Sequence, residues 1–414
     1  GLKVNRTLRK GDDLPEGVDN AGKRVDRFNR AWIESQKRWA KNLLTRQNPY
    51  TKTTLAEDPA VLSVELNNES ALLFENLNWI DTLPAPYKRE LTALWNDFLS
   101  RKYKNDKALL AAWNRDASLP GASLLNPEGR WGFEQPDALK VFRNTADSVS
   151  ATVTRRSNQD WQIQFQRSGL SLENGKTYTL EFDVRGEGDP IRIVLSQDRP
   201  DWHNCGLEAS LSLTSEWRHQ RYSFQAKNAD PGHVRISFGV GHARKVEIAA
   251  VRLFPGTKPV SARLSSGSIP LPVAPNDAMS ADLLEFMVEL DTRYAEEMLD
   301  YLRKDLNVKS LVIDTQIDWG GLSGLRREKR MDYVDAHAYW GHPEFTGGSW
   351  EFKPGCWKIL NQSQIPRIVH GGWCPLEQFS RYRISTKPFS ISEHDYPYPH
   401  DYAVEMMPLL VSVA

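Results

Sequence analysis

The fold is decided by the stretch Ala-Val-Leu-Ser-Val-Glu-Leu-Asn-Asn-Glu-Ser at residues 60–70. Its first seven residues form an apolar, β-favouring run that is typical of a buried strand. Upstream, apolar side chains such as Phe28 and Trp32 recur at helical spacing, and residues 2–5 read as another strand. Strand, helix and strand in this order are the signature of a parallel sheet. We therefore expect a β/α architecture around this stretch.

The β/α alternation resumes in the last third of the chain. Helical spacing returns at residues 286–301, and strand-like runs follow at residues 310–315, 333–337 and 388–392. In a (β/α)8 barrel, the chain that leaves the carboxyl end of a strand lies on the active-site face. Polar residues directly after these strands are therefore candidates for a functional site.

Between these two parts, from about residue 126 to residue 254, apolar and polar residues alternate with period two. Trp161, Ile163 and Phe165 alternate with three glutamines, and Asn174-Gly175 is a turn signal of the hairpin type. Many short alternating strands predict a β-sandwich. Because the β/α order continues on both sides, we interpret the sandwich as an insertion. The predicted divisions are residues 1–121 for the first β/α part, 122–256 for the sandwich, 257–280 for a linker and 281–414 for the second β/α part.

The composition excludes several classes of partner. Lys and Arg total 53, as do Asp and Glu, so no net charge draws the chain to nucleic acid or to a membrane surface. No run approaches the ~20 apolar residues that span a bilayer. The 14 tryptophans suit sugar-binding surfaces as well as a large core. The three cysteines make neither a disulfide framework nor a metal cluster, and pairing of Cys356 with Cys374 stays open.

Two carboxylates terminate predicted strands. Glu69, next to Asn68, follows the strand at residues 60–66, and Glu393 follows the run at residues 388–392. Glycoside cleavage needs two carboxyl groups, one to protonate the leaving group and one to attack the anomeric carbon or activate water. A solvated loop position would explain either glutamate alone. Together they predict a glycosidase site, in which the Asn68 amide can hold a substrate hydroxyl.

A third candidate is the run Asp-Ala-His-Ala-Tyr-Trp at residues 335–340. Alternation turns His337 and Tyr339 to one side of the strand, so both can point into a site or into the core. A tyrosine hydroxyl that bonds a carboxylate helps to keep that carboxylate ionised. Further candidates for contacts with substrate are Gln316, Asp318 and Trp319 after the strand at residues 310–315, together with Trp340 and His394.

In the sandwich region, Trp161 and Trp202 are the aromatic residues that we expect to touch sugar. Trp202 lies in a polar loop between Asp201 and His203. Trp161 alternates in step with apolar residues and fits the core equally well. A structural spacer is the alternative role for this module.

At these residues the chain resembles the clan-A glycoside hydrolases, the cellulase-like (β/α)8 group, and particularly bacterial members with an inserted carbohydrate-binding module. In that clan the acid/base glutamate follows an asparagine at the end of the fourth strand, which matches Asn68-Glu69. The nucleophile ends the seventh strand, which matches Glu393. A His-x-Tyr pattern near the sixth strand matches His337 and Tyr339.

The resemblance covers nearly the whole chain. Residues 48–51 and 58–61, which lead into the first glutamate, form a run associated with these enzymes, and residues 122–254 are similar to the family-four and family-nine type carbohydrate-binding modules. The implied fold is a partial (β/α)8 TIM barrel, about strands three to seven, with an inserted all-β jelly-roll sandwich. The implied function is a retaining hydrolase that cleaves β-linked glycosides by double displacement, with an oligo- or polysaccharide as partner and no cofactor or metal.

Strands one, two and eight of the clan's barrel, and the site arginine of its early part, have no match in this chain. We therefore interpret the chain as a fragment of a longer secreted or periplasmic protein for polysaccharide degradation. A barrel that lacks three strands exposes sheet edges, so the fragment alone is not expected to be active. The sequence predicts no particular oligomeric state, and glucan, mannan and galactan are all compatible substrates.

Two alternatives stay open. The first is a non-catalytic carbohydrate-binding protein whose barrel has decayed, which an inactive full-length protein would support. The second is a metal-dependent hydrolase that uses His394, Asp395, His400 and Asp401, although their spacing matches no metal motif that we recognise. Loss of activity with a chelator would favour this second alternative.

Overall fold

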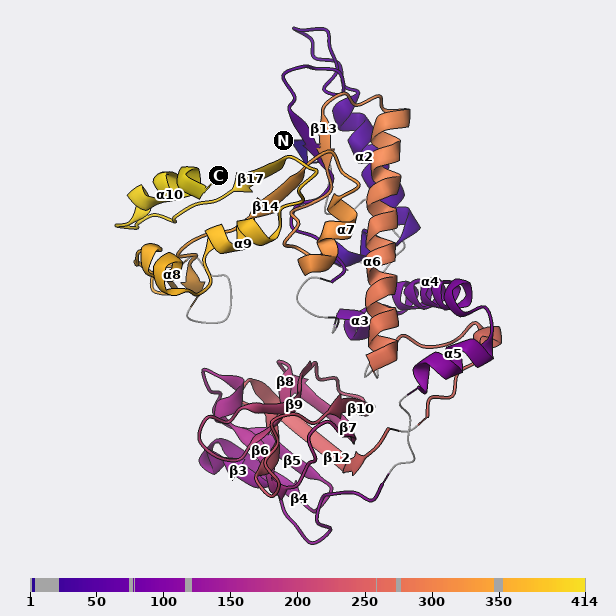
Figure 1. Ribbon diagram of the computed structural model, residues 1–414, viewed down its shortest axis with the longest axis vertical. Helices are drawn as coiled ribbons and strands as arrows, with labels where there is room; N and C mark the ends of the chain where they lie inside the picture. The colour runs from indigo at the N-terminus through magenta and orange to yellow at the C-terminus, as the bar shows by residue number, and fades with distance from the viewer. Residues whose placement is uncertain are drawn as a thin grey trace. The chain divides into compact units, whose positions relative to one another are not determined.

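Figure 1 shows the computed structural model of the protein, which describes residues 2–3, 22–73, 77, 79–115, 121–257, 259–272, 277–345 and 353–413. The chain divides into two compact units, Gly1–Leu77 with Met287–Ala414 and Asn78–Phe286. Each unit has its own hydrophobic core. Within the described ranges, no helix combines the length and the apolar character needed to cross a membrane.

The first unit is built on short parallel strands. β1 (Leu2–Lys3), β2 (Ser63–Glu65) and β13 (Leu311–Ile313) form a sheet in the order β1-β2-β13. β14 (Val334–His337) pairs in parallel with β17 (Phe389–Glu393). A third, antiparallel pair is formed by β15 (Glu344–Phe345) and β16 (Trp357–Lys358). The described strands of this unit therefore form one three-stranded and two two-stranded sheets, and they do not form a closed barrel.

Helices alternate with these strands along the chain, as expected. α2 (Arg30–Leu44) begins after Asn29, whose side chain caps it by accepting a hydrogen bond from the backbone N–H of Trp32. Buried Leu44 of this helix packs in the same core as Val64 of β2. The other helices outside the sandwich are α1 (Gly22–Val25), α3 (Trp79–Thr82), α4 (Ala85–Tyr103), α5 (Asp106–Trp113), α6 (Asp277–Asp300), α7 (Gly324–Glu328), α8 (Ile365–His370), α9 (Pro375–Arg381) and α10 (Met406–Val413).

The second unit contains the β-sandwich, which is made of two five-stranded antiparallel sheets (Figure 1). The strand orders are β10-β7-β12-β5-β4 and β3-β6-β11-β8-β9. Phe165, Phe182 and Phe238 are fully buried in its core. The strands are β3 (Gly132–Glu134), β4 (Leu139–Asn144), β5 (Val149–Val153), β6 (Gln164–Leu170), β7 (Thr177–Gly188), β8 (Ile191–Gln197), β9 (Asn204–Leu211), β10 (Arg218–Gln225), β11 (Val234–Gly239) and β12 (Ala243–Pro255).

All ten sandwich strands lie in sequence between β2 and β13, which are neighbours in one parallel sheet. The strands predicted around β2, β13, β14 and β17 are confirmed, each within a few residues of its predicted bounds. The predicted division boundaries stay predictions. Residues 4–5 of the first predicted strand, and residues 258 and 273–276 of the predicted linker, lie outside the described residues.

Two local predictions for the sandwich are wrong. Asn174-Gly175 does form a turn, but it joins β6 to β7, which belong to opposite sheets and therefore make no hairpin. Trp161 does not continue the alternation of Ile163 and Phe165, because it lies in a 3-10 turn before β6 begins and is 50% exposed. A residue outside the pleat is not bound by its period of two.

Candidate active site and sandwich pocket

Glu69 lies in the turn after β2, and its backbone is held in an unusual conformation. Its φ of 51° is in the left-handed region, which costs a non-glycine residue roughly 1–3 kcal/mol and is enriched at functional sites. The Glu69 N–H donates to the side-chain oxygen of buried Gln316 at 3.0 Å. The Gln316 amide nitrogen in turn donates to Oε1 of Glu65 at 2.6 Å. Side chains from two neighbouring strand segments therefore support this turn.

The residues on either side of Glu69 are tied to buried charges. The Asn67 amide donates to Oδ1 of Asp314 at 2.8 Å. Arg27, which is fully buried, pairs with Oδ2 of Asp314 at 2.9 Å and donates to the Ser70 hydroxyl at 3.3 Å. Removing one member of a buried ion pair typically costs about 3–5 kcal/mol, so this cluster gives the turn a rigid base.

β14 and β17 supply the other half of the site. Ala336 pairs with Ile391, whereas His337 pairs with Glu393, so the register passes over Ser392. A bulge of this kind re-aims side chains and is common next to active sites. As a result, both Ser392 and Glu393 reach side chains of the β14 segment, although simple alternation would turn them to opposite faces.

His337 lies between the two glutamates. Its Nδ1 is 3.0 Å from Oε1 of Glu69 and 3.6 Å from Oε2 of Glu393. One ring nitrogen and one oxygen from each carboxylate all lie within 4.8 Å of one another. His337 is 3% exposed, and both glutamates are half-buried. Three residues that the sequence singled out are thus brought together.

Glu69 and His337 line a pocket of about 310 Å³, whereas Glu393 is not among its lining residues. Burial raises the pKa of Asp318 to about 6, with the charge of Glu69 adding to the rise and His337 opposing it. Tyr339 donates a hydrogen bond to Oε2 of Glu393, and burial together with this bond raises the pKa of Tyr339 above its ordinary value. The pocket is lined by Glu69, Asp318, Trp319, His337, Tyr339, Gln378 and Tyr382.

Four residues predicted to contact substrate are not among those that line this pocket: Asn68, Gln316, Trp340 and His394. Trp340 is 4% exposed, and its indole N–H donates to a backbone carbonyl at 2.7 Å. Its position has the opposite parity to Tyr339, so alternation turns it into the core. His394 lies 2.6 Å from the carbonyl of Ala338 through Nδ1. Gln316 acts behind Glu69, as described above.

Several residues at the site escaped the sequence analysis. Gln378 of α9 donates to Oδ2 of Asp318 at 2.9 Å, and Tyr382 follows the same helix. Nothing in a short helix far along the chain signals that it borders the pocket. Asp335 and Ser392 lie within the predicted strands at residues 333–337 and 388–392, but their contact depends on the bulge between them. Arg27 precedes α2 and gives no local signal of its role.

The residues of the proposed metal alternative do not gather. In the described part of the chain, the group of His, Cys, Asp and Glu side chains close enough to share a metal ion is that of Glu69, His337 and Glu393. His394, Asp395, His400 and Asp401 form no such group there. Cys356 and Cys374 are both free thiols, as is Cys205, so the open pairing does not occur.

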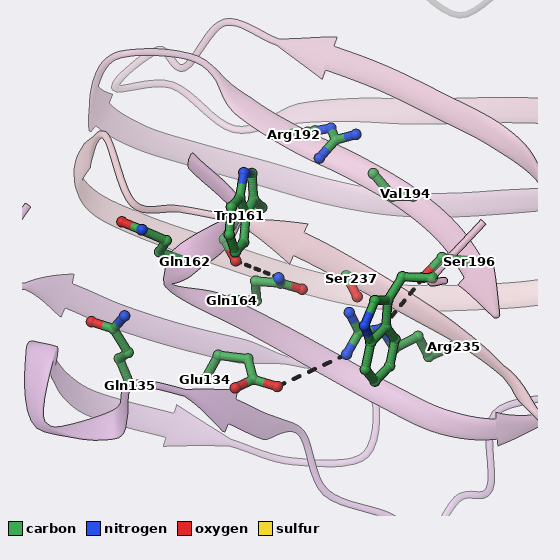
Figure 2. Close-up of a pocket in the computed structure, with 12 residues that line it drawn as sticks. Glu134, Gln135, Trp161, Gln162, Gln164, Arg192, Val194, Ser196, Arg235 and Ser237 are labelled. Atoms are coloured by element: carbon green, nitrogen blue, oxygen red, sulfur yellow. Dashed lines mark hydrogen bonds and ion pairs between the residues drawn. The ribbon is translucent and has the colours of Figure 1, made fainter. Parts of the chain in front are cut away.

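Figure 2 shows a second pocket, of about 600 Å³, on the sandwich sheet β3-β6-β11-β8-β9. Trp161 and Trp202 both line it and are each 50% exposed. The guanidinium of Arg235 lies 4.5 Å from the ring centre of Trp202 and donates to Gln166 at 2.7 Å. The remaining lining residues are Glu134, Gln135, Gln162, Gln164, Arg192, Val194, Ser196, Ser237 and Gly239.

Comparison with known proteins gives no family: no family model matches the chain, and no curated protein matches it. Similar solved structures are carbohydrate-binding modules. A CBM4 structure shares 23% identity over 34% of this chain and 97% of its own, with a TM-score of 0.28. The N-terminal cellulose-binding domain of Cellulomonas fimi β-1,4-glucanase C shares 22% identity over 32% of this chain and 99% of its own, with a TM-score of 0.25. A family 11 carbohydrate-binding module of a Clostridium thermocellum cellulosomal cellulase shares 16% identity over 35% of this chain and 100% of its own, with a TM-score of 0.24.

Proposed function

We propose that the first unit carries the active site of a retaining glycoside hydrolase of the clan-A type. The observation that carries this proposal is the placement of Glu69 after β2 and of Glu393 at the carboxyl end of β17, with carboxylate oxygens within 4.8 Å. Retaining enzymes need carboxyl groups about 5–5.5 Å apart, whereas inverting enzymes leave ~6.5–9.5 Å for a water. The close approach of these oxygens favours the retaining route.

The two glutamates take different roles. Glu393, which accepts the Tyr339 hydrogen bond, attacks the anomeric carbon as a carboxylate, and the bond to the leaving oxygen breaks. Glu69 gives that oxygen its proton. Glu69 then accepts a proton from water, whose oxygen attacks the anomeric carbon and releases Glu393. No step needs a metal or a cofactor.

The fold interpretation follows the same reasoning. β1, β2, β13, β14 and β17 follow in this order along the chain, with the sandwich strands inserted between β2 and β13 and the pair β15-β16 between β14 and β17. All observed pairings among the five are parallel. We interpret them as strands three to seven of a (β/α)8 barrel. Glu69 and Glu393 then both lie at the carboxyl ends of strands, where barrel enzymes carry their catalytic groups. A secreted or periplasmic location stays a prediction.

The test is hydrolysis of β-glucosidic, β-mannosidic and β-galactosidic substrates by the full-length protein. Proton NMR of the first-formed sugar should show retention of the β-configuration. Release of the α-anomer would change Glu393 from nucleophile to general base. Activity that disappears with a chelator and returns with zinc would support a metal-dependent hydrolase instead.

The second candidate function is saccharide binding without catalysis, and the sandwich pocket favours it. Two half-exposed indoles beside arginine, glutamine and serine side chains offer stacking faces together with hydrogen-bond donors, a combination that suits a sugar. A full-length protein that binds oligosaccharides but hydrolyses none of the panel would establish this alternative. Because both functions can coexist, binding and hydrolysis should be measured on the same preparation.

A further inference from the structure

The hydrogen bonds around His337 determine which of its ring nitrogens carries a proton. Its Nε2 lies 2.8 Å from the hydroxyl of Ser392, and that hydroxyl lies 2.5 Å from Oδ2 of Asp335. A serine hydroxyl has a single proton to donate, and an ionised carboxylate only accepts. The Ser392 proton therefore goes to Asp335. Nε2 must then be the donor toward Ser392, so it carries a hydrogen.

Asp335 has the surroundings of an acceptor. It is fully buried and receives the hydroxyls of Ser390 and Ser392. The amide nitrogen of Gln316 also approaches Oδ2 at 3.3 Å. Three donors therefore point at the Asp335 carboxylate, which accepts a hydrogen bond from Ser392 and does not hydrogen-bond His337 directly.

The other ring nitrogen faces the glutamates. A neutral imidazole carries one hydrogen, so with Nε2 protonated, Nδ1 has a free lone pair directed at Oε1 of Glu69, 3.0 Å away. That contact is a hydrogen bond only if Glu69 supplies the proton or if the ring becomes an imidazolium. One proton is therefore shared between Glu69 and His337.

We propose that Ser392, anchored by Asp335, is a positioning residue that holds the Nε2–H of His337 in place, so that Nδ1 accepts the proton shared with Glu69 and does not donate a ring proton to it. This inference rests on the proposed function, since a protonated Glu69 is what the first step of a retaining mechanism requires. Without the Ser392 hydroxyl, the ring proton moves to Nδ1, where two carboxylates attract it. An Nδ1–H would donate to Glu69 and favour its ionised form.

The charged and titratable groups around the ring are few. Glu69 and Glu393 face Nδ1, and Asp335 lies 3.7 Å from Nε2. Two further electrostatic interactions reach this group, one between Asp318 and His337 and one between Tyr339 and Glu69. Of these groups, Asp335 loses a direct hydrogen bond when Ser392 is changed. Ser390→Ala also removes a hydroxyl from Asp335, so a shift in pH dependence that appears only in Ser392→Ala would arise from the His337 ring.

The chain offers a matched control. Ser390 and Ser392 both donate to Asp335, but of the two only Ser392 has a bond to His337 among the described contacts. Ser390→Ala removes the same kind of bond without freeing the ring. Ser392→Thr keeps the hydroxyl that Ser392→Ala removes.

The first measurement needs no activity. Histidine is labelled with 15N in the full-length protein, and the His337 signals are assigned by their loss in His337→Gln. The ring nitrogens should show the Nε2–H form in the wild type, in Ser390→Ala and in Ser392→Thr, and the Nδ1–H form in Ser392→Ala. A wild-type ring in the Nδ1–H form, or no change in Ser392→Ala, would overturn the inference.

The second measurement is the pH profile of kcat/KM. Ser392→Ala should lower the basic limb by about one pH unit, the scale of one hydrogen bond to a charged group, whereas Ser390→Ala should leave it in place. An unchanged limb in an active Ser392→Ala variant also overturns the proposal. If the wild type hydrolyses nothing while the ring signals behave as described, the proposed function fails and the inference about the tautomer stands.

Discussion

The phenolic hydroxyl of Tyr339 donates a hydrogen bond to Oε2 of Glu393, although the two residues are 54 positions apart in the sequence. The bond exists because β14 and β17 are parallel neighbours with a bulge at their carboxyl ends. With its pKa raised, Tyr339 keeps its proton throughout the physiological range and remains a donor. A donor at this oxygen stabilises the ionised carboxylate that a nucleophile requires.

Tyr339→Phe should therefore reduce kcat/KM by about 10- to 100-fold, the value of one charge-assisted hydrogen bond. Because the lost bond favoured the charged form, Glu393 should take up a proton at higher pH, and the acid limb of the profile should move upward. Tyr382→Phe, in the same pocket, is the control and should leave the limb in place. An unmoved acid limb in Tyr339→Phe would show that the bond does not tune Glu393.

The two glutamates should respond differently to substitution. Glu393→Gln should form no covalent intermediate and lose turnover with every substrate. Glu69→Gln should lose about 10²–10⁴-fold with ordinary glycosides, since the leaving oxygen then departs without a proton. Aryl glycosides with acidic leaving groups need no proton, so their first step should be largely spared. Glu377→Gln, on α9 outside the pocket lining, is the control, and equal losses with both substrate types would exclude Glu69 as the acid.

Saccharide binding by the sandwich should depend on the two pocket indoles. Trp161→Ala and Trp202→Ala should each weaken binding by about 1 kcal/mol, roughly fivefold in Kd, because each removes an aromatic stacking face. Trp217, which is 44% exposed and stacks on Arg185 outside the pocket lining, provides the matched control. Calorimetric titration with oligosaccharides measures the difference. If Trp217→Ala weakens binding as much as the pocket variants do, saccharide does not bind in this pocket.

Asp26 should make stability depend on pH. Burial raises its pKa from 3.8 to about 7, with Arg27 opposing the rise. Below about pH 4 the carboxyl is protonated in both the folded and unfolded states, and between about pH 4 and 7 the unfolded state alone loses the proton. The free energy of unfolding should therefore fall across this interval and stay lower above it.

Asp26→Asn should flatten this pH dependence. Relative to wild type, the free energy of unfolding of the variant should be higher at pH 8 than at pH 4 by on the order of 1–3 kcal/mol. Denaturant titrations at the two pH values measure the difference. Asp300→Asn, at a largely exposed position, is the control and should leave the wild-type pH dependence of the free energy of unfolding unchanged. A wild-type slope retained in Asp26→Asn would assign the pH dependence to another buried group, such as Glu328, whose pKa burial raises to about 8.

The strands and the polar residues at their ends were predictable because local sequence patterns indicate them. The apolar run before Glu69, the short strand before Glu393 and the alternation in residues 178–184 depend on neighbours within a few positions. The same alternation correctly turned His337 and Tyr339 to one side. It failed at Trp161, because a 3-10 turn interrupts the pleat there and no local signal announces it.

By itself, the sequence determined the short strands of both units and the placement of Glu69 and Glu393 at strand ends, since backbone periodicity and turn residues act over short distances. Only the tertiary structure decided which side chains meet around His337. The bulge between β14 and β17 directs Ser392 as well as Glu393 toward it, and Gln316 holds the left-handed backbone of Glu69 from 247 positions away. Contacts over such separations depend on strand register, and register is set by how the whole sheet packs.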